Sequence, residues 1–414
     1  MGQHKSWSRL DNAAKIFPPT SSRRSTKVFR LVCVLNEPVD KGTLQRALER
    51  AMDAFPLYRS VLKKGLFWYY FEESDIRPQV REECLPVCSP LYHVDRHGLL
   101  FRVNYFGQRI NLEVFHSLAD GSGALRFLRC MIHHYLALKH GLTGHLADDE
   151  PARDQVDQDA FYQYYDKSGA IPKQDHYKAY RIRGERYPRN GLSIMEGLMS
   201  ARAALDKAHE HQASLSEFLV AHLICAILDG MAVRDRQRPI VITVPVDLRR
   251  FFPAQTARNF FGLMLVKIDA CKEIPDFKQV LDIVRESFER QLSRDNLSVV
   301  ISRYSAIENN PFIKAIPLQL KIPILRLAGL RSERGDTAGF SNVGRVVMPE
   351  EDARYIRMFG VYFSAKRPQM CVCSFGDTLA ISMSSPLMDT AVQRRFFRRL
   401  TSLGIAVQVI SNLP

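Results

Sequence analysis

The distribution of apolar residues predicts a chain rich in short β-strands. Residues 28–35 (VFRLVCVL) form an apolar run, and in residues 109–116 (RINLEVFH) apolar and polar positions alternate with the period of two that is typical of a strand. Gly107 and Gln108 predict a hairpin turn just before the second of these. Further strand-like runs lie at residues 65–73, 99–106, 191–200, 240–248, 262–270, 339–347, 358–365, 369–375, 379–385 and 405–410.

Helical spacing of apolar residues predicts several helices between these strands. In residues 43–55, Leu44, Leu48, Met52 and Phe55 recur at helical intervals. A capping-box pattern, Ser214 to Glu217, opens a second helix at residues 215–228, and we expect its apolar face to be Leu215, Leu219, Leu223, Ala226 and Ile227. The remaining predicted helices are residues 124–138, 277–292 and 390–403.

The order of these elements indicates the fold class and the number of units. Strands and helices mix without the regular alternation of a doubly wound sheet, so we predict an α+β fold with sheets covered on one side. Residues 143–190 are polar and irregular, and we interpret them as a crossover linker. At 414 residues the chain exceeds the roughly 250 to 300 at which a single core stops growing. We therefore predict two domains, residues 1–185 and 186–414.

Composition and charge exclude some classes of protein and leave others open. Hydrophobic residues make up 46% of the chain and charged residues 25%, which excludes wholesale disorder. The formal net charge of +14 is compatible with a phosphate-bearing or acidic partner and equally with solubility alone. No nucleic-acid-binding motif accompanies it, so we expect no nucleic-acid partner. Paired arginines at 249–250, 394–395 and 398–399 are most simply solvated faces.

The N-terminal sequence and the cysteines bear on location. Residues 1–17 lack the apolar core of a signal peptide, and no run approaches the roughly 18 apolar residues of a membrane span. We expect a soluble, cytoplasmic, monomeric protein without a transmembrane segment. The eight cysteines lie mostly in apolar segments, which favours buried free thiols. Two closer sets, Cys84 and Cys88 with His93 and His97, and Cys371 with Cys373, lack paired zinc-ligand spacing, so we expect no metal.

One segment carries candidate chemistry. His116 follows the strand of residues 109–115, and the period of two places it at the end of the inward face. Asp120 lies four residues later in the same loop, and the Gly121-Ser122-Gly123 sequence allows a tight turn before the next helix. A histidine fixed beside a carboxylate can act as a general base near neutral pH. The structural alternative is a core histidine followed by a helix-capping aspartate.

The sequence His116 to Gly121, HxxxDG between a strand and a helix, resembles the signature of the chloramphenicol-acetyltransferase-like superfamily. That superfamily includes condensation domains of peptide synthetases, BAHD acyltransferases and alcohol acetyltransferases, and this chain most resembles the alcohol acetyltransferase and stand-alone condensation-like branch. Other segments agree in order along nearly the whole chain: DNAAKIFP, FPLYRSVL, SLSEFLVAHLICAIL, PVDLRRFFPAQTARNFFG and SNVGRVVMP. The resemblance implies a V-shaped pair of similar subdomains, a pseudo-dimer with a central tunnel.

The resemblance also implies roles for individual residues. His116 matches the catalytic histidine, which accepts a proton from the acceptor while the acceptor attacks a thioester, without a covalent acyl-enzyme. Asp120 matches the motif aspartate, whose role is structural because it pairs with an arginine. Arg249 matches that arginine best, with Arg250 and Arg258 as alternatives. Gly121 matches the glycine whose backbone lines the tunnel.

Some features depart from the superfamily pattern. Phe115 replaces the first of two consecutive histidines found in many condensation domains, but that position is not the base. The DFGWG segment of plant BAHD enzymes is absent, which argues against the plant branch. For the oxyanion stabiliser, Ser341 and Asn342 are candidates, with a turn-forming role as the alternative.

These residues and the resemblance together predict an acyltransferase. The donor would be an acyl-CoA or an acyl group on the phosphopantetheine of a carrier protein, used as a co-substrate without a metal. The acceptor would be a small alcohol. The alternatives are a carrier-dependent condensation that forms an amide with an amine, or a non-catalytic relative that binds a ligand or a carrier protein.

Overall fold

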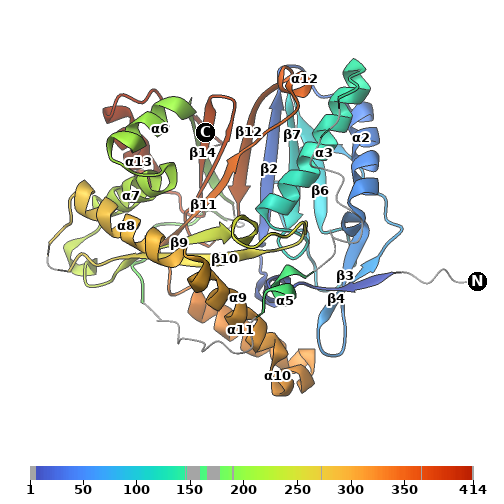
Figure 1. Ribbon diagram of the computed structural model, residues 1–414, viewed down its shortest axis with the longest axis horizontal. Coiled ribbons are helices and arrows are strands. Elements are labelled where there is room, and N and C mark those ends of the chain that lie inside the picture. The colour runs from blue at the N-terminus through green and yellow to red at the C-terminus, as the bar shows by residue number, and fades with distance from the viewer. Residues whose placement is uncertain are drawn as a thin grey trace, which may run out of the picture.

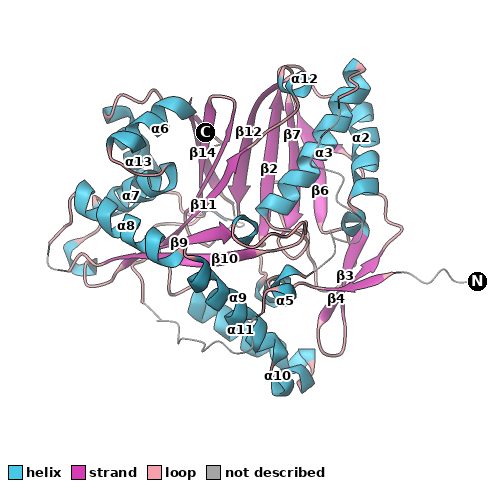
Figure 2. Cartoon of the chain, in the orientation of Figure 1, coloured by secondary structure: helices cyan, strands magenta, loops and turns pink. Residues whose placement is uncertain are grey.

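The computed structural model describes residues 6–144, 146, 159–165, 178–188, 191–271, 273–364 and 366–412. Two larger β-sheets form the centre of the molecule, with helices packed on them (Figures 1 and 2). A mixed α and β architecture of this kind agrees with the predicted fold class. The predicted linker, residues 143–190, falls partly outside the described residues; within it the structure shows the short helix α5 (Ala160–Gln163).

The first sheet has five strands in the order β12, β2, β7, β6 and β5. Their bounds are β12 (Ile356–Phe363), β2 (Val28–Leu35), β7 (Arg109–Phe115), β6 (Phe101–Phe106) and β5 (Arg81–Glu82). Neighbouring strands are antiparallel except β5 and β6. The predicted turn at Gly107 and Gln108 joins β6 to β7, and Gly107 has a φ of +56°. A hairpin of β3 (Ser60–Lys64) and β4 (Tyr69–Glu73) pairs with β1 (Trp7–Arg9) in a separate small sheet.

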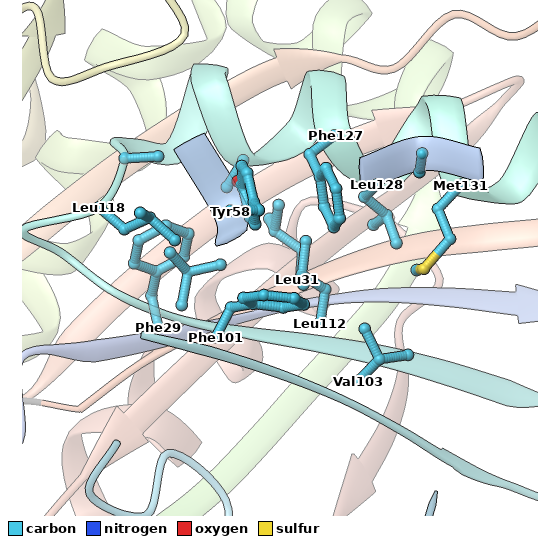
Figure 3. Close-up of a cluster of buried hydrophobic side chains, with 14 of the residues drawn as sticks. Phe29, Leu31, Tyr58, Phe101, Val103, Leu112, Leu118, Phe127, Leu128 and Met131 are labelled. Atoms are coloured by element: carbon cyan, nitrogen blue, oxygen red, sulfur yellow. The ribbon is translucent and has the colours of Figure 1, made fainter. Parts of the chain in front are cut away.

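Helices α2 (Lys41–Ala54) and α3 (Gly121–His140) contact each other and pack on the first sheet. Between α3 and the strands lies a cluster of aromatic and aliphatic side chains, in which the ring of Tyr58 stacks on Phe127 with centroids 3.8 Å apart (Figure 3). Phe29 of β2 belongs to the same cluster and also reaches the loop that follows β7. The core thus packs against the residue that follows the end of β7.

The polar face of β7 is buried as well. Asn111 and Glu113 alternate with apolar residues as predicted, yet both side chains are buried. The carboxylate of Glu113 accepts hydrogen bonds from Arg30 and Arg102 and, at 2.7 Å, from the backbone N–H of Cys88. A buried ion-pair network therefore covers the second face of this sheet, which the alternating pattern could not reveal.

The second sheet has seven strands in the order β10, β9, β11, β13, β14, β8 and β15. Their bounds are β10 (Phe261–Ile268), β9 (Ile240–Asp247), β11 (Ala338–Arg345), β13 (Gln369–Phe375), β14 (Thr378–Ser385), β8 (Ser193–Ser200) and β15 (Gln408–Ser411). Helices that contribute to its core are α6 (Ala201–Glu210), α7 (Leu215–Leu228), α8 (Phe277–Gln291) and α13 (Ala391–Ser402).

Helix α7 begins with the predicted capping box, since Ser214 and Glu217 exchange side-chain to backbone hydrogen bonds. Its predicted apolar face was too narrow, because every residue from Phe218 to Leu228 is buried. The described part of the chain holds no single helix long and apolar enough to span a bilayer, and α6 with α7 meets that test only as a pair bent by 81°.

The two sheets meet along β12, β13 and β14, which lie side by side. Tyr362 of β12 donates a hydrogen bond to Glu196 of β8, and Cys373 Sγ lies 3.2 Å from the carbonyl oxygen of Phe359. Cys371 and Cys373 are thus core residues at this junction. Strand β12 comes from the predicted second domain but hydrogen bonds to β2 of the first, so the chain crosses between the two sheets.

Three helices at the lower edge of the molecule were not predicted from the sequence: α9 (Arg294–Asn309), α10 (Pro311–Ala315) and α11 (Leu318–Ser332) (Figure 1). Helix α11 packs on the short helix α1 (Phe17–Thr20). Gly329 allows the close approach, because a Cβ there would lie 2.7 Å from Cγ2 of Thr20. The remaining short helix, α12 (Glu350–Ala353), precedes β12.

Candidate active site

His116 occupies the first position of the turn that leaves β7. Its backbone N–H donates to the carbonyl of Lys27 at 2.9 Å, which continues the pairing of β7 with β2 by one residue. The next residue, Ser117, donates to the carbonyl of Ala14 at 3.0 Å. The loop is therefore held on both sides before α3 begins, and the imidazole is fixed to a rigid corner of the backbone.

Aromatic rings surround the imidazole of His116. Phe17 stacks on it with centroids 4.4 Å apart, and Phe29 meets it edge-on at 5.2 Å. Phe261 and Phe363 approach at 5.5 and 5.8 Å. The first two residues come from the predicted N-terminal half and the last two from the C-terminal half. The ring therefore lies where the halves meet, and it remains partly exposed.

A hydrogen-bonded chain of side chains leads away from the imidazole. Nδ1 of His116 lies 3.0 Å from Oδ1 of Asn259, and Nδ2 of Asn259 donates to Oδ2 of Asp11 at 3.2 Å. Since the amide N–H of Asn259 faces a carboxylate, its oxygen faces the histidine, so Nδ1 carries the proton. This tautomer leaves the lone pair on Nε2, the nitrogen that can accept a proton.

Asn259 and Asp11 were missed as functional candidates in the sequence. Both lie in segments that carry the resemblance, DNAAKIFP and PVDLRRFFPAQTARNFFG. Membership of these segments was therefore the only signal in the sequence, since no local pattern marks either residue. Asp11 is fully buried, and the backbone N–H groups of Ala14 and Asn259 also donate to its carboxylate at 2.7 and 3.3 Å.

Burial shifts the pKa values of the two titratable ends of this chain in opposite directions. It lowers the pKa of His116 below the ordinary 6.5, although the charge of Asp120 and the hydrogen bond to Asn259 oppose the shift. It raises the pKa of Asp11 to about 7, with a further contribution from the nearby Asp159. The imidazole is therefore neutral at neutral pH, as a general base must be.

Asp120 caps helix α3 and binds the opposite half of the chain. Oδ1 accepts from the N–H of Gly123 at 2.9 Å. Oδ2 accepts from Nη1 of Arg249 at 2.9 Å and from the backbone N–H of Phe260 at 2.8 Å. The capping role and the ion pair thus coexist in one carboxylate.

Of the three arginines considered for this ion pair, the structure brings Arg249 to Asp120. The same guanidinium donates to Asp247 at 2.9 Å and to the carbonyl of Thr256 at 3.0 Å. Arg258 instead points to the N-terminal strand, where it donates to the carbonyl of Arg9 and to Ser8. Arg250 is exposed.

The two glycines of the motif loop differ in how closely they are packed. A Cβ at Gly121 would meet only Cγ2 of Val343, at 4.0 Å. A Cβ at Gly123 would lie 1.9 Å from the carbonyl oxygen of Ala257. Real Cβ atoms essentially never come so close to another heavy atom. The close approach of α3 to the C-terminal half therefore requires glycine at 123, a position that the sequence had not singled out from its neighbour.

The oxyanion candidates lie on β11. Asn342 Nδ2 donates to Ser216 Oγ at 3.0 Å, and its Oδ1 accepts from the N–H of Gly344 at 2.8 Å, so its side chain supports the β-bulge at this point. The register of β11 with β13 shifts between Asn342 and Gly344, so the alternation of faces is interrupted at Val343. Val343 lies against Gly121, and this part of β11 therefore borders the motif loop.

Two surface cavities lie away from His116. Two surface cavities of about 250 and 340 Å³ lie beside Tyr355 and beside Met358, and His116 lines neither. Among the described residues no group of three or more His, Cys, Asp or Glu side chains could hold a metal ion. All eight cysteines are free, and Cys84 and Cys271 are exposed.

Comparison with known proteins places this geometry in a wider context. No protein-family model and no curated protein sequence matches the chain. Among solved structures, TRI101 of Fusarium sporotrichioides in complex with coenzyme A and T-2 is similar, with a TM-score of 0.66, 12% identity, and coverage of 98% of this chain and 99% of that one. Trichothecene 15-O-acetyltransferase TRI3 of the same organism gives 0.61 and 11%, with coverage of 97% and 95%.

A third match comes from another class of enzyme. The first condensation domain of the CDA synthetase gives a TM-score of 0.61 and 15% identity, and the alignment covers 99% of this chain and 100% of that one. At such identities the likeness concerns the fold, and it extends over nearly the full length of both chains. The chain therefore has the fold that these acetyltransferases and this condensation domain share.

Proposed function

We propose that this protein transfers an acyl group from a thioester donor to the hydroxyl group of a small acceptor, with His116 as the general base. The observation that carries the proposal is the state of the imidazole. It is neutral, partly exposed and held through Nδ1, so that Nε2 is the free basic nitrogen. The fold, which acetyltransferases and condensation domains share, supports the same reaction class.

In this mechanism Nε2 of His116 accepts the proton of the acceptor hydroxyl as the oxygen attacks the thioester carbonyl carbon. A tetrahedral oxyanion forms. It collapses by breaking the C–S bond, and the leaving thiolate takes the proton back from the imidazolium. Atoms and charges balance without a covalent acyl-enzyme, and general-base catalysis of this kind contributes about 10²- to 10⁴-fold in rate.

Asp120 and Arg249 help to position His116 without contacting its imidazole. Their ion pair joins the start of α3 to the segment that ends in Asn259, the residue that holds the imidazole. Removing Arg249 would leave the buried carboxylate of Asp120 without its cation, whereas Arg249 would keep Asp247 as a partner if Asp120 were removed. We assign both residues a positioning role, because their contacts are with each other, with Asp247 and with the backbone.

For the oxyanion we favour Ser341 over Asn342. The amide of Asn342 is engaged by Ser216 and by the bulge, whereas Ser341 precedes the bulge and is partly exposed. A single donor to an oxyanion contributes about 10²- to 10³-fold in turnover. Ser341→Ala should therefore lower kcat by about this factor, and Asn342→Ala should act mainly on stability.

A basic cluster offers a place for the phosphates of a donor. Burial and then the positive charges of Arg367, Arg334 and Arg238 lower the pKa of Arg181, and the carboxylate of Asp336, which pairs with Arg367, opposes this shift. Such crowding is relieved by an anion. Lys366 and Lys27, which flank Glu333, link this cluster to the strand end where Lys27 binds the backbone of His116. We propose that the donor approaches from this side and that the two halves form a V with the reaction in a tunnel between them.

The test is to incubate the protein with a panel of acyl-CoA donors and a pool of alcohols and amines, and to identify products by mass spectrometry. Ester products that vanish with His116→Ala, at an unchanged melting temperature, support the proposal. His134→Ala, a partly exposed histidine on α3, is the matched control. Amide products would indicate the condensation reaction instead, and binding without products, unaffected by His116→Ala, would indicate a non-catalytic relative.

A further inference from the structure

The lower edge of the molecule exposes an unusual set of large apolar side chains. They lie at the tip of the β3–β4 hairpin and along α10 and α11, they are 42 to 81% exposed, and we call them the α10–α11 surface: Leu66, Phe67, Phe312, Leu320, Ile324 and Leu327. Leu320, Ile324 and Leu327 follow one another at helical spacing and therefore share one face of α11. A soluble monomer rarely leaves such a contiguous patch uncovered.

The hairpin tip and α11 form one continuous structure. The backbone N–H of Leu318 donates to the carbonyl of Leu66 at 2.8 Å, and Nζ of Lys321 donates to the carbonyl of Phe67 at 3.2 Å. The same ammonium lies over the ring of Trp68, 3.9 Å from its centroid. In Figure 1 the hairpin and α10 both project from this edge of the molecule. The apolar residues are thus presented together by elements that are far apart in the sequence.

The charges in these segments are mostly positive. Residues 311–332 contain Lys314, Lys321, Arg326 and Arg331 and no acidic residue, although Lys321 is buried. At the hairpin Lys64 is exposed, whereas Lys63 pairs with Glu72. Apolar side chains flanked by lysine, arginine and a tryptophan are the composition of segments that lie in the interface of an anionic membrane. A protein partner with an apolar face would not require this excess of positive charge.

We propose that the α10–α11 surface docks on an anionic lipid bilayer, with the apolar side chains inserted among the lipids and the basic residues at the headgroups. Helix α11 also packs on α1, whose Phe17 stacks on His116, so the docked face lies one helix away from the candidate active site. The proposal does not depend on acyl transfer, because docking is measured without turnover.

The test is sedimentation of the full chain with vesicles of phosphatidylcholine alone or with about one third phosphatidylglycerol, at physiological salt. We expect binding to the anionic vesicles at least about tenfold tighter than to the neutral ones. The combined variant Leu320→Gln, Ile324→Gln, Leu327→Gln should lose at least about tenfold in partitioning with an unchanged melting temperature, since the replaced side chains are exposed. Val233→Gln, at an apolar residue that is 72% exposed elsewhere, should bind as the unaltered chain does.

A second readout uses the two tryptophans of the chain, Trp7 and Trp68. In a Trp7→Phe variant, the emission of Trp68 should shift to the blue with anionic vesicles, and Leu66→Ser should reduce the shift. The proposal is overturned if the unaltered chain does not sediment with anionic vesicles, or if the combined variant binds as tightly as the unaltered chain. It is also overturned if light scattering shows a dimer that the combined variant dissociates, because the surface would then join two copies.

Discussion

Oδ1 of Asn259 lies 3.0 Å from Nδ1 of His116, although 143 residues separate the two in the chain. The amide is itself oriented by the buried carboxylate of Asp11. Three residues from distant segments thus decide which nitrogen of the imidazole carries the proton. The base is prepared by its neighbours and not by the motif alone.

Asp11→Asn should switch this arrangement. Three N–H groups, those of Ala14 and of the backbone and side chain of Asn259, need two acceptor oxygens at position 11, and asparagine has only one. Turning the side-chain amide of Asn259 removes the repulsion between its NH₂ group and the NH₂ group of the new asparagine. It also presents the NH₂ group of Asn259 to His116. Nitrogen NMR of the imidazole should then show the proton on Nε2, and turnover should fall roughly 10- to 100-fold. Asp53→Asn, at an exposed carboxylate, is the control; an unchanged tautomer would contradict the assignment.

The contribution of Asp11 to the free energy of unfolding should decrease as the pH rises. Its folded-state pKa is raised from 3.8 to about 7, so the folded protein binds the proton more tightly than the unfolded chain. This contribution to stability is complete below about pH 4 and is lost as the pH rises to about 7. Urea unfolding across this range should show the difference in stability between the unaltered protein and Asp11→Asn shrinking or reversing as the pH rises. A constant difference would show that Asp11 has an ordinary pKa.

His116 should impose an acid limb on activity. Because burial lowers its pKa, the imidazole stays neutral below pH 6.5, and kcat/KM should remain on its plateau there and fall only at more acid pH. The unfolded chain takes up the proton at 6.5 first, so stability is also lost as the pH falls below 6.5. The His116→Gln variant cannot take up this proton, so its free energy of unfolding should fall less with decreasing pH than that of the unaltered protein. A fall in kcat/KM with its midpoint at or above pH 6.5 would contradict the conclusion that burial lowers the pKa of His116.

The ion pair of Asp120 and Arg249 should matter for stability as well as rate. Both side chains are largely buried, so Arg249→Ala leaves a buried carboxylate without its cation, and we expect a loss of about 3 to 5 kcal/mol in the free energy of unfolding. Arg250→Ala, at the exposed neighbour, should change stability by less than about 0.5 kcal/mol. Denaturant unfolding of both variants makes the comparison. Equal, small effects would remove the ion pair from the description of the site.

Gly123 and Gly121 form a matched pair for testing the packing of the motif loop. Gly123→Ala places a methyl group against the carbonyl of Ala257 and should destabilise the protein by about 3 kcal/mol. Gly121→Ala meets only the end of Val343 and should cost less than about 1 kcal/mol. Thermal unfolding measures both. The reverse order would mean that α3 and the Ala257 segment are not in the contact described.

Local sequence determined most of the regular structure. The apolar run of β2, the helical spacing of α2 and the capping box of α7 each act within a few residues, and each element appears at nearly the predicted bounds. The position of His116 between β7 and α3 follows from the same short-range rules. Helix α11 was missed because its apolar residues are spread over more than one face and Pro323 lies inside it, so the helical period is blurred.

The tertiary structure alone decided the state of the site. The contact of Asn259 with His116, the burial of Asp11 and the pairing of β12 with β2 join residues separated by more than a hundred positions. Such contacts leave no periodic trace along the chain, because they depend on how two sheets pack and not on the geometry of one helix or strand. The sequence alone could name the histidine; its protonation and tautomer depend on burial and on partners that only the folded chain brings together.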